Sequence, residues 1–332
     1  MSTRPSIKSI AKALGISHMT VSRALSERGS VSPKTREAVL NYARSVGYVK
    51  SAAAESMRGG YSRIVGLLLP NIVNEYYARV ADRMAEACRA RDHHLIVHIT
   101  NDDPEAEGEA FERLMQLQAA GIVYVPAPGA TQKAPAFAGQ NCVQAIRRRP
   151  TGEPQSFVGL DDATAIAEAA RRLAESGCRK VAMIAGGRDL STGKARQDAF
   201  LKGLRAAGLG DNAAVIMDGK PSFALGRQGF AQALDDAEVT GIVCGGFEIS
   251  NGAVSAYLEL PQEQRNRIKL IGYGDPSFYA WLDGGISTIN PPVYELADKA
   301  LELLLGQGAA GGAPRDVLFP TELKIRRSSE ET

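Results

Sequence analysis

Apolar side chains recur at helical spacing in two short runs near the N-terminus, with a glycine between them. Residues 7–14 place isoleucine, alanine and leucine on one helical face, and Gly15 then supplies the permissive backbone of a sharp turn. Ser17 is a suitable N-cap for a second helix over residues 18–25. The inner face of this second helix consists of Val21, Ala24 and Leu25. The pattern therefore predicts two short helices joined by a tight turn.

A third helix is predicted after a loop that contains Gly29. Ser32 and Pro33 supply a cap and a first-turn proline, and Gly47 ends the helix. Its apolar positions are Val39, Leu40, Ala43 and Val46. Helices in this arrangement are typical of a helix-turn-helix, in which the second helix enters the major groove of DNA. Residues 1–48 are therefore predicted to form an all-α DNA-binding headpiece.

The outward side chains of this headpiece are the candidates for DNA contact. They are Ser17, His18, Met19, Thr20, Ser22, Arg23, Lys34 and Arg36. We expect His18, Met19 and Arg23 to read base edges. The hydroxyl residues are expected to serve phosphates and packing, and the two basic residues near the start of the third helix are further phosphate candidates.

Basic residues are concentrated at the N-terminal end of the chain. Residues 1–63 hold 11 Lys and Arg against 3 Glu, a net charge of +8. The whole chain carries only +2, so the remaining 269 residues carry −6. This asymmetry indicates an attached module for a polyanion such as DNA. A three-helix structural cap with a solvated basic face is the alternative.

Two motifs in the headpiece carry a family resemblance. The first reads Ser-Ile-Lys-x-Ile-Ala-x-x-x-Gly-Ile-Ser-x-x-Thr-Val-Ser-Arg-x-Leu from Ser6, and the second reads Val-Ser-x-x-Thr-Arg-x-x-Val-Leu from Val31, followed by Gly47-Tyr48. Together they resemble the headpiece of the LacI/GalR family of bacterial transcription regulators, and the likeness extends more loosely over the rest of the chain. The resemblance implies a homodimer that binds a palindromic operator on double-stranded DNA.

Residues 49–62 read as a hinge. An alanine-rich helix too short to be stable alone is followed by Gly59-Gly60. In the family that the chain resembles, this segment folds as a hinge helix on DNA, pairs with its dimer mate and wedges a side chain into the minor groove. Met57 takes the wedge position, and methionine can unstack a base step, whereas Glu55 departs from the family pattern. A disordered spacer is the alternative.

Beyond the hinge, short apolar strands alternate with helical runs from residue 64 to residue 273. Such alternation predicts parallel sheets buried on both faces. We expect an α/β body over residues 63–332, made of two doubly wound parallel-sheet lobes with a ligand cleft at the strand C-termini, as in periplasmic-binding-protein-like folds. Lobe 1 is expected to comprise about residues 63–159 and 290–317, and lobe 2 about residues 160–289 and 318–332.

The resemblance also implies a pocket for a small-molecule effector in the cleft. The residues proposed for it are Asn74, Tyr76, Tyr77, Arg147, Arg196, Phe223, Phe247 and Asp275. Tyr76 and Tyr77 would stack on the ligand and Arg196 would clamp it. The Asp161-Asp162 pair that opens the second lobe is either part of the same site or a helix cap.

Three positions depart from the pattern of sugar-binding members, where polar side chains accept hydrogen bonds from sugar hydroxyls. They are Arg147, the pair Gly246-Phe247 and Gly274, with Glu248 one place away from an expected acceptor. Fewer acceptors and an added cation indicate an effector that carries negative charge, such as a sugar acid. The alternative is that Arg147 points to solvent beside Arg148 and Arg149.

Other classes of site are poorly supported. Residues 187–195 resemble a phosphate-binding loop but lack its spacing and its Ser or Thr. His94 and His98 lie on an apparent strand, where a shared metal ion is disfavoured. No catalytic set stands out, so we expect no enzyme activity, no metal and no cofactor. The four cysteines are scattered singly, and no apolar run reaches membrane-spanning length, which favours a cytoplasmic protein.

The sequence as a whole predicts a ligand-responsive, sequence-specific transcriptional regulator. We expect a repressor of carbohydrate or sugar-acid catabolic genes that a small effector releases from its operator. The C-terminus has no leucine heptads, so a dimer is preferred to a tetramer. An activator or dual regulator is the alternative within this class, and a cytosolic solute-binding protein or an α/β enzyme would explain fewer segments.

Overall fold

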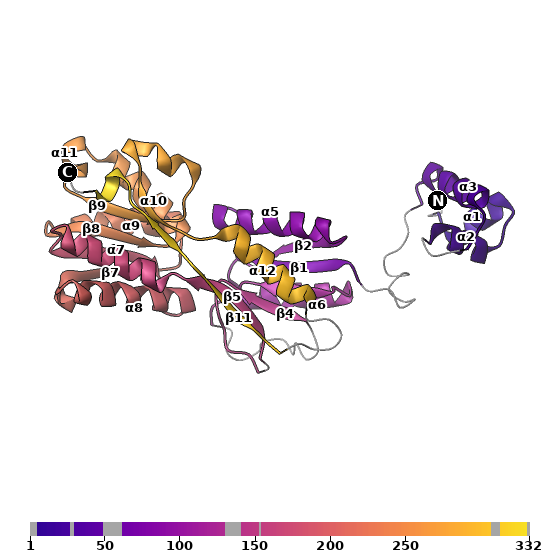
Figure 1. Cartoon of the computed structure of the whole chain (residues 1–332), viewed down its shortest axis with the longest axis horizontal. Helices are drawn as coiled ribbons and strands as arrows, with labels where there is room; N and C mark the ends of the chain where they lie inside the picture. The colour runs from indigo at the N-terminus through magenta and orange to yellow at the C-terminus, as the bar shows by residue number, and fades with distance from the viewer. Residues whose placement is uncertain are drawn as a thin grey trace. The chain divides into compact units, whose positions relative to one another are not determined.

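The computed structural model describes residues 5–26, 30–48, 62–129, 141–152, 154–306 and 313–330. The chain divides into two units, Met1–Ser62 and Arg63–Thr332, and Figure 1 draws both. Met57, the predicted wedge, lies outside the described residues.

The first unit contains three short helices, as predicted. They are α1 (Ile7–Leu14), α2 (His18–Leu25) and α3 (Pro33–Ser45). Gly15 has a left-handed backbone with φ of 65°, which allows the turn between α1 and α2. The Ser17 hydroxyl accepts a hydrogen bond from the Thr20 N–H at 3.0 Å and so caps α2. Ile10, Val21 and Val39, one from each helix, are fully buried together.

Within the described residues, the second unit contains two six-stranded sheets, one in each lobe. The sheet of lobe 1 is parallel throughout, in the order β11-β5-β4-β3-β1-β2. Its strands are β1 (Ile64–Leu69), β2 (His94–Ile99), β3 (Gly121–Tyr124), β4 (Cys142–Ala145), β5 (Ser156–Asp161) and β11 (Asp316–Pro320). Helices α5 (Glu75–Ala90) and α12 (Val293–Gly306) cover one face, and α6 (Pro104–Gln116) covers the other (Figure 1).

The sheet of lobe 2 has the order β12-β10-β9-β8-β6-β7. Its strands are β6 (Lys180–Gly186), β7 (Ala214–Gly219), β8 (Val239–Gly245), β9 (Lys269–Tyr273), β10 (Ser287–Asn290) and β12 (Glu322–Lys324). Helices α7 (Ala163–Glu175) and α8 (Ser191–Ala206) pack on one face, and α9 (Phe223–Leu234) and α10 (Phe247–Glu259) on the other (Figure 1). Short helical turns are α11 (Gln262–Arg265) and the 3₁₀ segments Asp211–Ala213, Ser277–Ala280, Leu282–Gly284 and Arg327–Ser329. The antiparallel pairing of β10 with β12 departs from the all-parallel expectation.

Two of the crossings between the lobes lie a few residues later than the sequence suggested. The expected crossings near residues 159 and 317 lie inside β5 and β11, which pair in register up to Asp161 and Pro320. The chain instead crosses after Asp161 and between Pro320 and Glu322, whereas the crossing between Asn290 and Val293 agrees with the expected boundary near residue 290. The two-lobed α/β fold itself is confirmed.

Candidate functional site

The headpiece presents one polar face of α2 to solvent. Ser17, His18, Met19 and Arg23 are exposed, and Met19 retains 57% of its accessible surface. Thr20 and Ser22 are half-buried, and the Thr20 hydroxyl lies 2.8 Å from that of Ser17. The exposed set can therefore reach base edges, while the two half-buried hydroxyl residues lie closer to the body of the headpiece.

The two basic candidates at the start of α3 differ in their surroundings. Lys34 is exposed. Arg36 is half-buried, and its Nη1 donates to the carbonyl oxygens of Ala24 and Ser26 at 3.1 and 2.8 Å. Arg36 thus satisfies carbonyl groups at the end of α2, which is a structural role.

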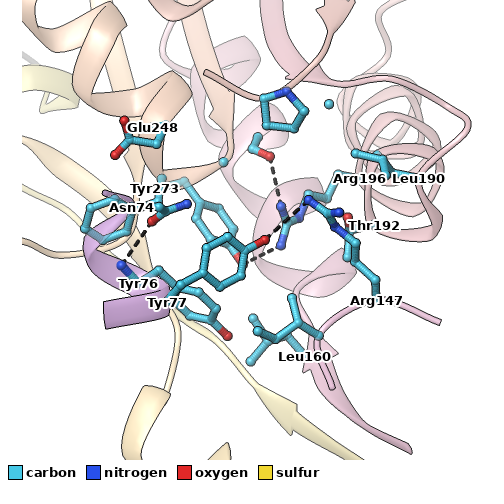
Figure 2. Close-up of a pocket in the computed structure, with 17 residues that line it drawn as sticks. Asn74, Tyr76, Tyr77, Arg147, Leu160, Leu190, Thr192, Arg196, Glu248 and Tyr273 are labelled. Atoms are coloured by element: carbon cyan, nitrogen blue, oxygen red, sulfur yellow. Dashed lines mark hydrogen bonds between the residues drawn. The ribbon is translucent and has the colours of Figure 1, made fainter. Parts of the chain in front are cut away.

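A small cavity lies in the cleft of the second unit, at the carboxyl ends of strands from both lobes. Six of the eight proposed effector residues line it, namely Asn74, Tyr76, Tyr77, Arg147, Arg196 and Phe247. Ile146, Leu160, Leu190, Thr192, Glu248 and Tyr273 also contribute to the wall. Figure 2 shows Tyr76, Tyr273 and Arg196 lying close together, although they come from α5, β9 and α8. The cavity measures about 60 Å³.

Arg196 is buried in a closed network of protein groups. Its Nε donates to Asp162 Oδ2 at 2.6 Å and its Nη1 donates to the Gly245 carbonyl at 2.9 Å. Its Nη2 donates to the Tyr273 hydroxyl at 2.7 Å, and that hydroxyl donates to Asp162 Oδ2 at 2.9 Å. Asp162 stands at the N-cap position of α7 without a side-chain capping bond, so its carboxylate serves Arg196 rather than the helix.

Arg147 points into the cleft and is only 6% exposed, so the solvent-facing alternative is wrong. Its Nη1 donates to Asp102, and its Nη2 donates to the Tyr77 hydroxyl at 3.3 Å. Asp102, the partner of Arg147, and Ile146, which precedes Arg147 in the chain, have positive φ angles of 61° and 68°. A β-branched residue such as Ile146 adopts that backbone at a cost, which is the kind of strain that functional sites retain.

The neighbouring arginines do not face the cleft. Arg148 is exposed and donates to Asp316 at 2.7 Å, and Arg149 is buried against Glu107.

The hydroxyl of Tyr76 is buried and has no hydrogen-bond partner among the described residues. Burial raises the pKa of this phenol, so it stays protonated and able to donate. Burial also raises the pKa of the Glu248 carboxyl on the opposite lobe. A ligand in the cavity would therefore meet one unsatisfied hydroxyl and one half-buried carboxyl group.

Two proposed effector residues lie away from the cavity. Phe223 begins α9, is 43% exposed and does not line the pocket. Asp275 accepts hydrogen bonds from Arg326 Nη1 at 2.8 Å and from Lys324 Nζ at 3.0 Å, and so anchors the C-terminal end of β12 within lobe 2. Both assignments are corrected by their side-chain positions, which tertiary packing decides.

The pocket departures at Phe247 and Gly274 prove to be linked. A Cβ atom at Gly274 would lie 2.2 Å from Cδ2 of Phe247, and Gly274 has a φ of 89° that side chains disfavour. The phenyl ring therefore occupies the space in which a longer residue at position 274 would stand.

Both arginines of the cavity are paired with carboxylates of the protein, which weakens the expectation of an anionic effector. Among the described residues that line the cavity, Arg147 has Asp102 as its partner and Arg196 has Asp162. Separating either pair to bind an anion would leave a carboxylate of low exposure without compensation.

Tyr273, Asp102 and Glu248 were not proposed as site residues from the sequence. A general rule could have indicated Tyr273, because it ends a buried strand and polar groups at the carboxyl ends of parallel strands meet at the ligand crevice. Asp102 comes shortly after the end of β2, a strand of lobe 1, and the same rule could have indicated it.

Among the residues that the structure describes, neither a membrane segment nor a metal cluster is found. In the described segments, no helix combines the length and apolarity that a membrane span requires. Nor do three or more His, Cys, Asp or Glu side chains gather there as metal ligands would. His94 is exposed and His98 half-buried on β2.

Comparisons with known proteins match both units. Residues 6–51 match the model of "Bacterial regulatory proteins, lacI family", and residues 170–329 match that of "Periplasmic binding protein-like domain". The HTH-type transcriptional regulator DegA of Bacillus subtilis is 24% identical, with 98% of each chain covered. The HTH-type transcriptional repressor PurR of Glaesserella parasuis is also 24% identical, with 97% of each chain covered.

Solved structures share the fold over nearly the whole chain. A LacI-family transcriptional regulator from Silicibacter pomeroyi superposes with a TM-score of 0.82 at 19% identity, covering 98% of this chain and 100% of that one. The lac repressor dimer bound to operator and the anti-inducer ONPF superposes with a TM-score of 0.81 at 19% identity, covering 98% and 99%.

Proposed function

Because the chain belongs to the LacI family of bacterial regulatory proteins, we propose that it is a homodimeric repressor that a neutral, hydroxyl-rich ligand releases from a palindromic operator. It is a DNA-binding transcriptional regulator rather than an enzyme, as its relatives are. The observation that supports operator binding is the exposed face of α2. The turn at Gly15 and the Ser17 cap position this helix so that the face can enter the major groove.

Repression and dimerisation are supported by the relatives. Several of them are named repressors, and the lac repressor was solved as a dimer on its operator. Two headpieces in a dimer can contact two half-sites one helical turn apart, which requires a two-fold symmetric site. The protein would act in the cytoplasm, where its DNA partner is.

A neutral effector fits the charge of the cavity better than an anion. Both lining arginines are paired within the protein, whereas the Tyr76 hydroxyl and the Glu248 carboxyl can exchange hydrogen bonds with ligand hydroxyls. The related fold of the regulator CelR was solved as a cellobiose complex, which is consistent with a sugar. Arg147 and Arg196 then orient neighbouring side chains and offer their remaining N–H groups to ligand oxygens.

Operator binding can be tested with the full-length protein. We expect selection from a random DNA pool to yield a palindrome that binds at least about 10³-fold more tightly than unrelated DNA at the same salt concentration. A chain that shows no sequence preference is not a regulator of this kind. Deleting the gene should raise transcription from the selected site, and a fall would identify an activator.

The effector class can be tested on the same complex by fluorescence anisotropy. Matched pairs such as glucose with glucuronate and galactose with galacturonate extend to a wider panel of neutral sugars and their acids. Release by a neutral sugar supports the proposal, whereas release by acids alone would restore the anionic alternative.

A further inference from the structure

Phe247 belongs to lobe 2 by its place in the chain but packs with lobe 1. It is the first residue of α10, directly after β8, and is only 5% exposed. Its ring joins the apolar cluster of Tyr76, Tyr77 and Val293, which α5 and α12 supply from lobe 1. The other buried apolar residues of α10, such as Ile249 and Ala253, join the core of lobe 2 instead. The ring therefore bridges the cleft.

The two polar networks beside Phe247 do not bridge the cleft. All protein partners given above for Arg147 belong to lobe 1, and those of Arg196 belong to lobe 2. Separation of the lobes would leave both networks intact. A hydrogen bond from the Arg148 N–H to Ser191 Oγ at 2.9 Å also crosses between the lobes, but at exposed residues, where water can replace it.

The ring of Phe247 also limits the space for a ligand. The remaining cavity of about 60 Å³ is much smaller than the roughly 300–1,000 Å³ of ordinary ligand pockets. Gly274 makes room for the ring, because a Cβ there would meet it at 2.2 Å. Ring and ligand therefore compete for the same volume.

We propose that Phe247 is a latch that closes the two lobes on its own and that an effector must displace to enter the cleft. Its action on the effector rests on the cleft being the effector site proposed above, but its hold on the lobes does not. Burial of a phenylalanine side chain is strong enough to shift an opening equilibrium by about 10- to 100-fold.

The latch can be tested by measuring the distance between the lobes in the full-length protein, with no DNA or sugar added. Glu112 in α6 of lobe 1 and Lys202 in α8 of lobe 2 are both exposed. Spin labels attached to Glu112→Cys and Lys202→Cys report the distance between the lobes by double electron–electron resonance. The four native cysteines are buried, and burial raises the pKa of Cys88 to about 11, which protects that thiol from the label.

Labelled chains are diluted with excess unlabelled chains, so that distances between protomers do not contribute, and we then expect one short distance in the parent protein. Phe247→Ala should lower the ratio of closed to open molecules about 10- to 100-fold, and Phe247→Leu should shift it by less. Phe223→Ala is the matched control, because Phe223 also begins a helix but is exposed and outside the cavity. Circular dichroism verifies that each variant is folded, and Phe247→Leu carries the test if the alanine variant does not fold.

An unchanged distance distribution in a folded Phe247 variant, or an equal shift in Phe223→Ala, overturns the latch. Because the measurement uses neither operator nor effector, its failure leaves the regulatory function untouched. Conversely, a chain that bound no palindrome could still show the latch.

Discussion

The guanidinium carbon of Arg196 lies 4.3 Å from the centre of the Tyr273 ring, and Nη2 of the same arginine donates to the Tyr273 hydroxyl at 2.7 Å. One tyrosine thus holds the arginine through both its face and its hydroxyl. Asp162 Oδ2 accepts from Nε and also contacts Nη2, so the guanidinium is oriented by protein groups alone. Arg196 is therefore a structural centre of lobe 2 as well as a wall of the cavity.

Loss of this arginine should destabilise the protein. Arg196→Ala leaves the buried Asp162 carboxylate without its cation, and we expect the free energy of unfolding to fall by about 3–5 kcal/mol. Urea denaturation followed by circular dichroism measures the change. The double variant Asp162→Asn with Arg196→Met removes both charges and should be less destabilised than Arg196→Ala. Equal stability of the two would show that the stranded carboxylate is not the cause.

Tyr76→Phe should weaken effector binding without lowering the stability of the protein. Its hydroxyl has no hydrogen-bond partner among the described residues, so removing it should leave the melting temperature unchanged or raise the stability by roughly 1–3 kcal/mol. An effector that satisfies this hydroxyl should bind the variant more weakly. Calorimetric titration with the releasing sugar provides the measurement, and unchanged affinity would remove the hydroxyl from recognition.

Arg23 and Lys34 should affect DNA binding in different ways. Arg23→Ala on the exposed face of α2 should cost about 1–3 kcal/mol and relax the preference at one base pair. Lys34→Ala, as a phosphate contact, should weaken selected and random DNA alike and reduce the salt dependence. Anisotropy titrations on both DNAs distinguish the two. Equal loss on both DNAs for Arg23→Ala would contradict base readout.

The contribution of Asp275 to the stability of the second unit should be lost at low pH. Burial acts to raise the pKa of this carboxyl, but hydrogen bonds from Arg326 and Lys324 outweigh burial and hold the pKa below its ordinary value. A carboxylate with a lowered folded pKa stabilises the fold above its unfolded pKa, near 3.9, and that contribution is lost as pH falls through the folded pKa. We expect Asp275→Asn to lower the melting temperature at pH 7 and to flatten its fall below about pH 4. The exposed Asp235→Asn is the control and should leave the profile unchanged.

Local signals in the sequence were sufficient for the headpiece. Its caps and glycine turn act over three or four residues, so Ser17, Gly15 and Ser32 fix the helix boundaries where they were predicted. The start of helix α10 lacks such a signal, because Gly246 has no side chain that could cap the helix.

The cleft depends on residues that are far apart in the chain. Arg147 and Asp102 are 45 residues apart and Arg196 and Tyr273 are 77 apart, so only the packing of several strands brings each pair together. The same dependence explains why Phe223 and Asp275 were misplaced. Their positions in the chain suited a pocket, but their side chains turn elsewhere.

The interleaving of the two lobes sets an order on biosynthesis. Lobe 1 takes Leu296, Leu301 and Leu304 of its core from α12, which the ribosome adds only after all but the last strand of lobe 2. At about 5–20 residues per second, the apolar face of its sheet waits roughly 7–30 s for that cover. During this interval the exposed apolar face of the nascent first lobe can bind a chaperone. Stop codons before residue 293 should yield aggregates rather than a shorter functional protein.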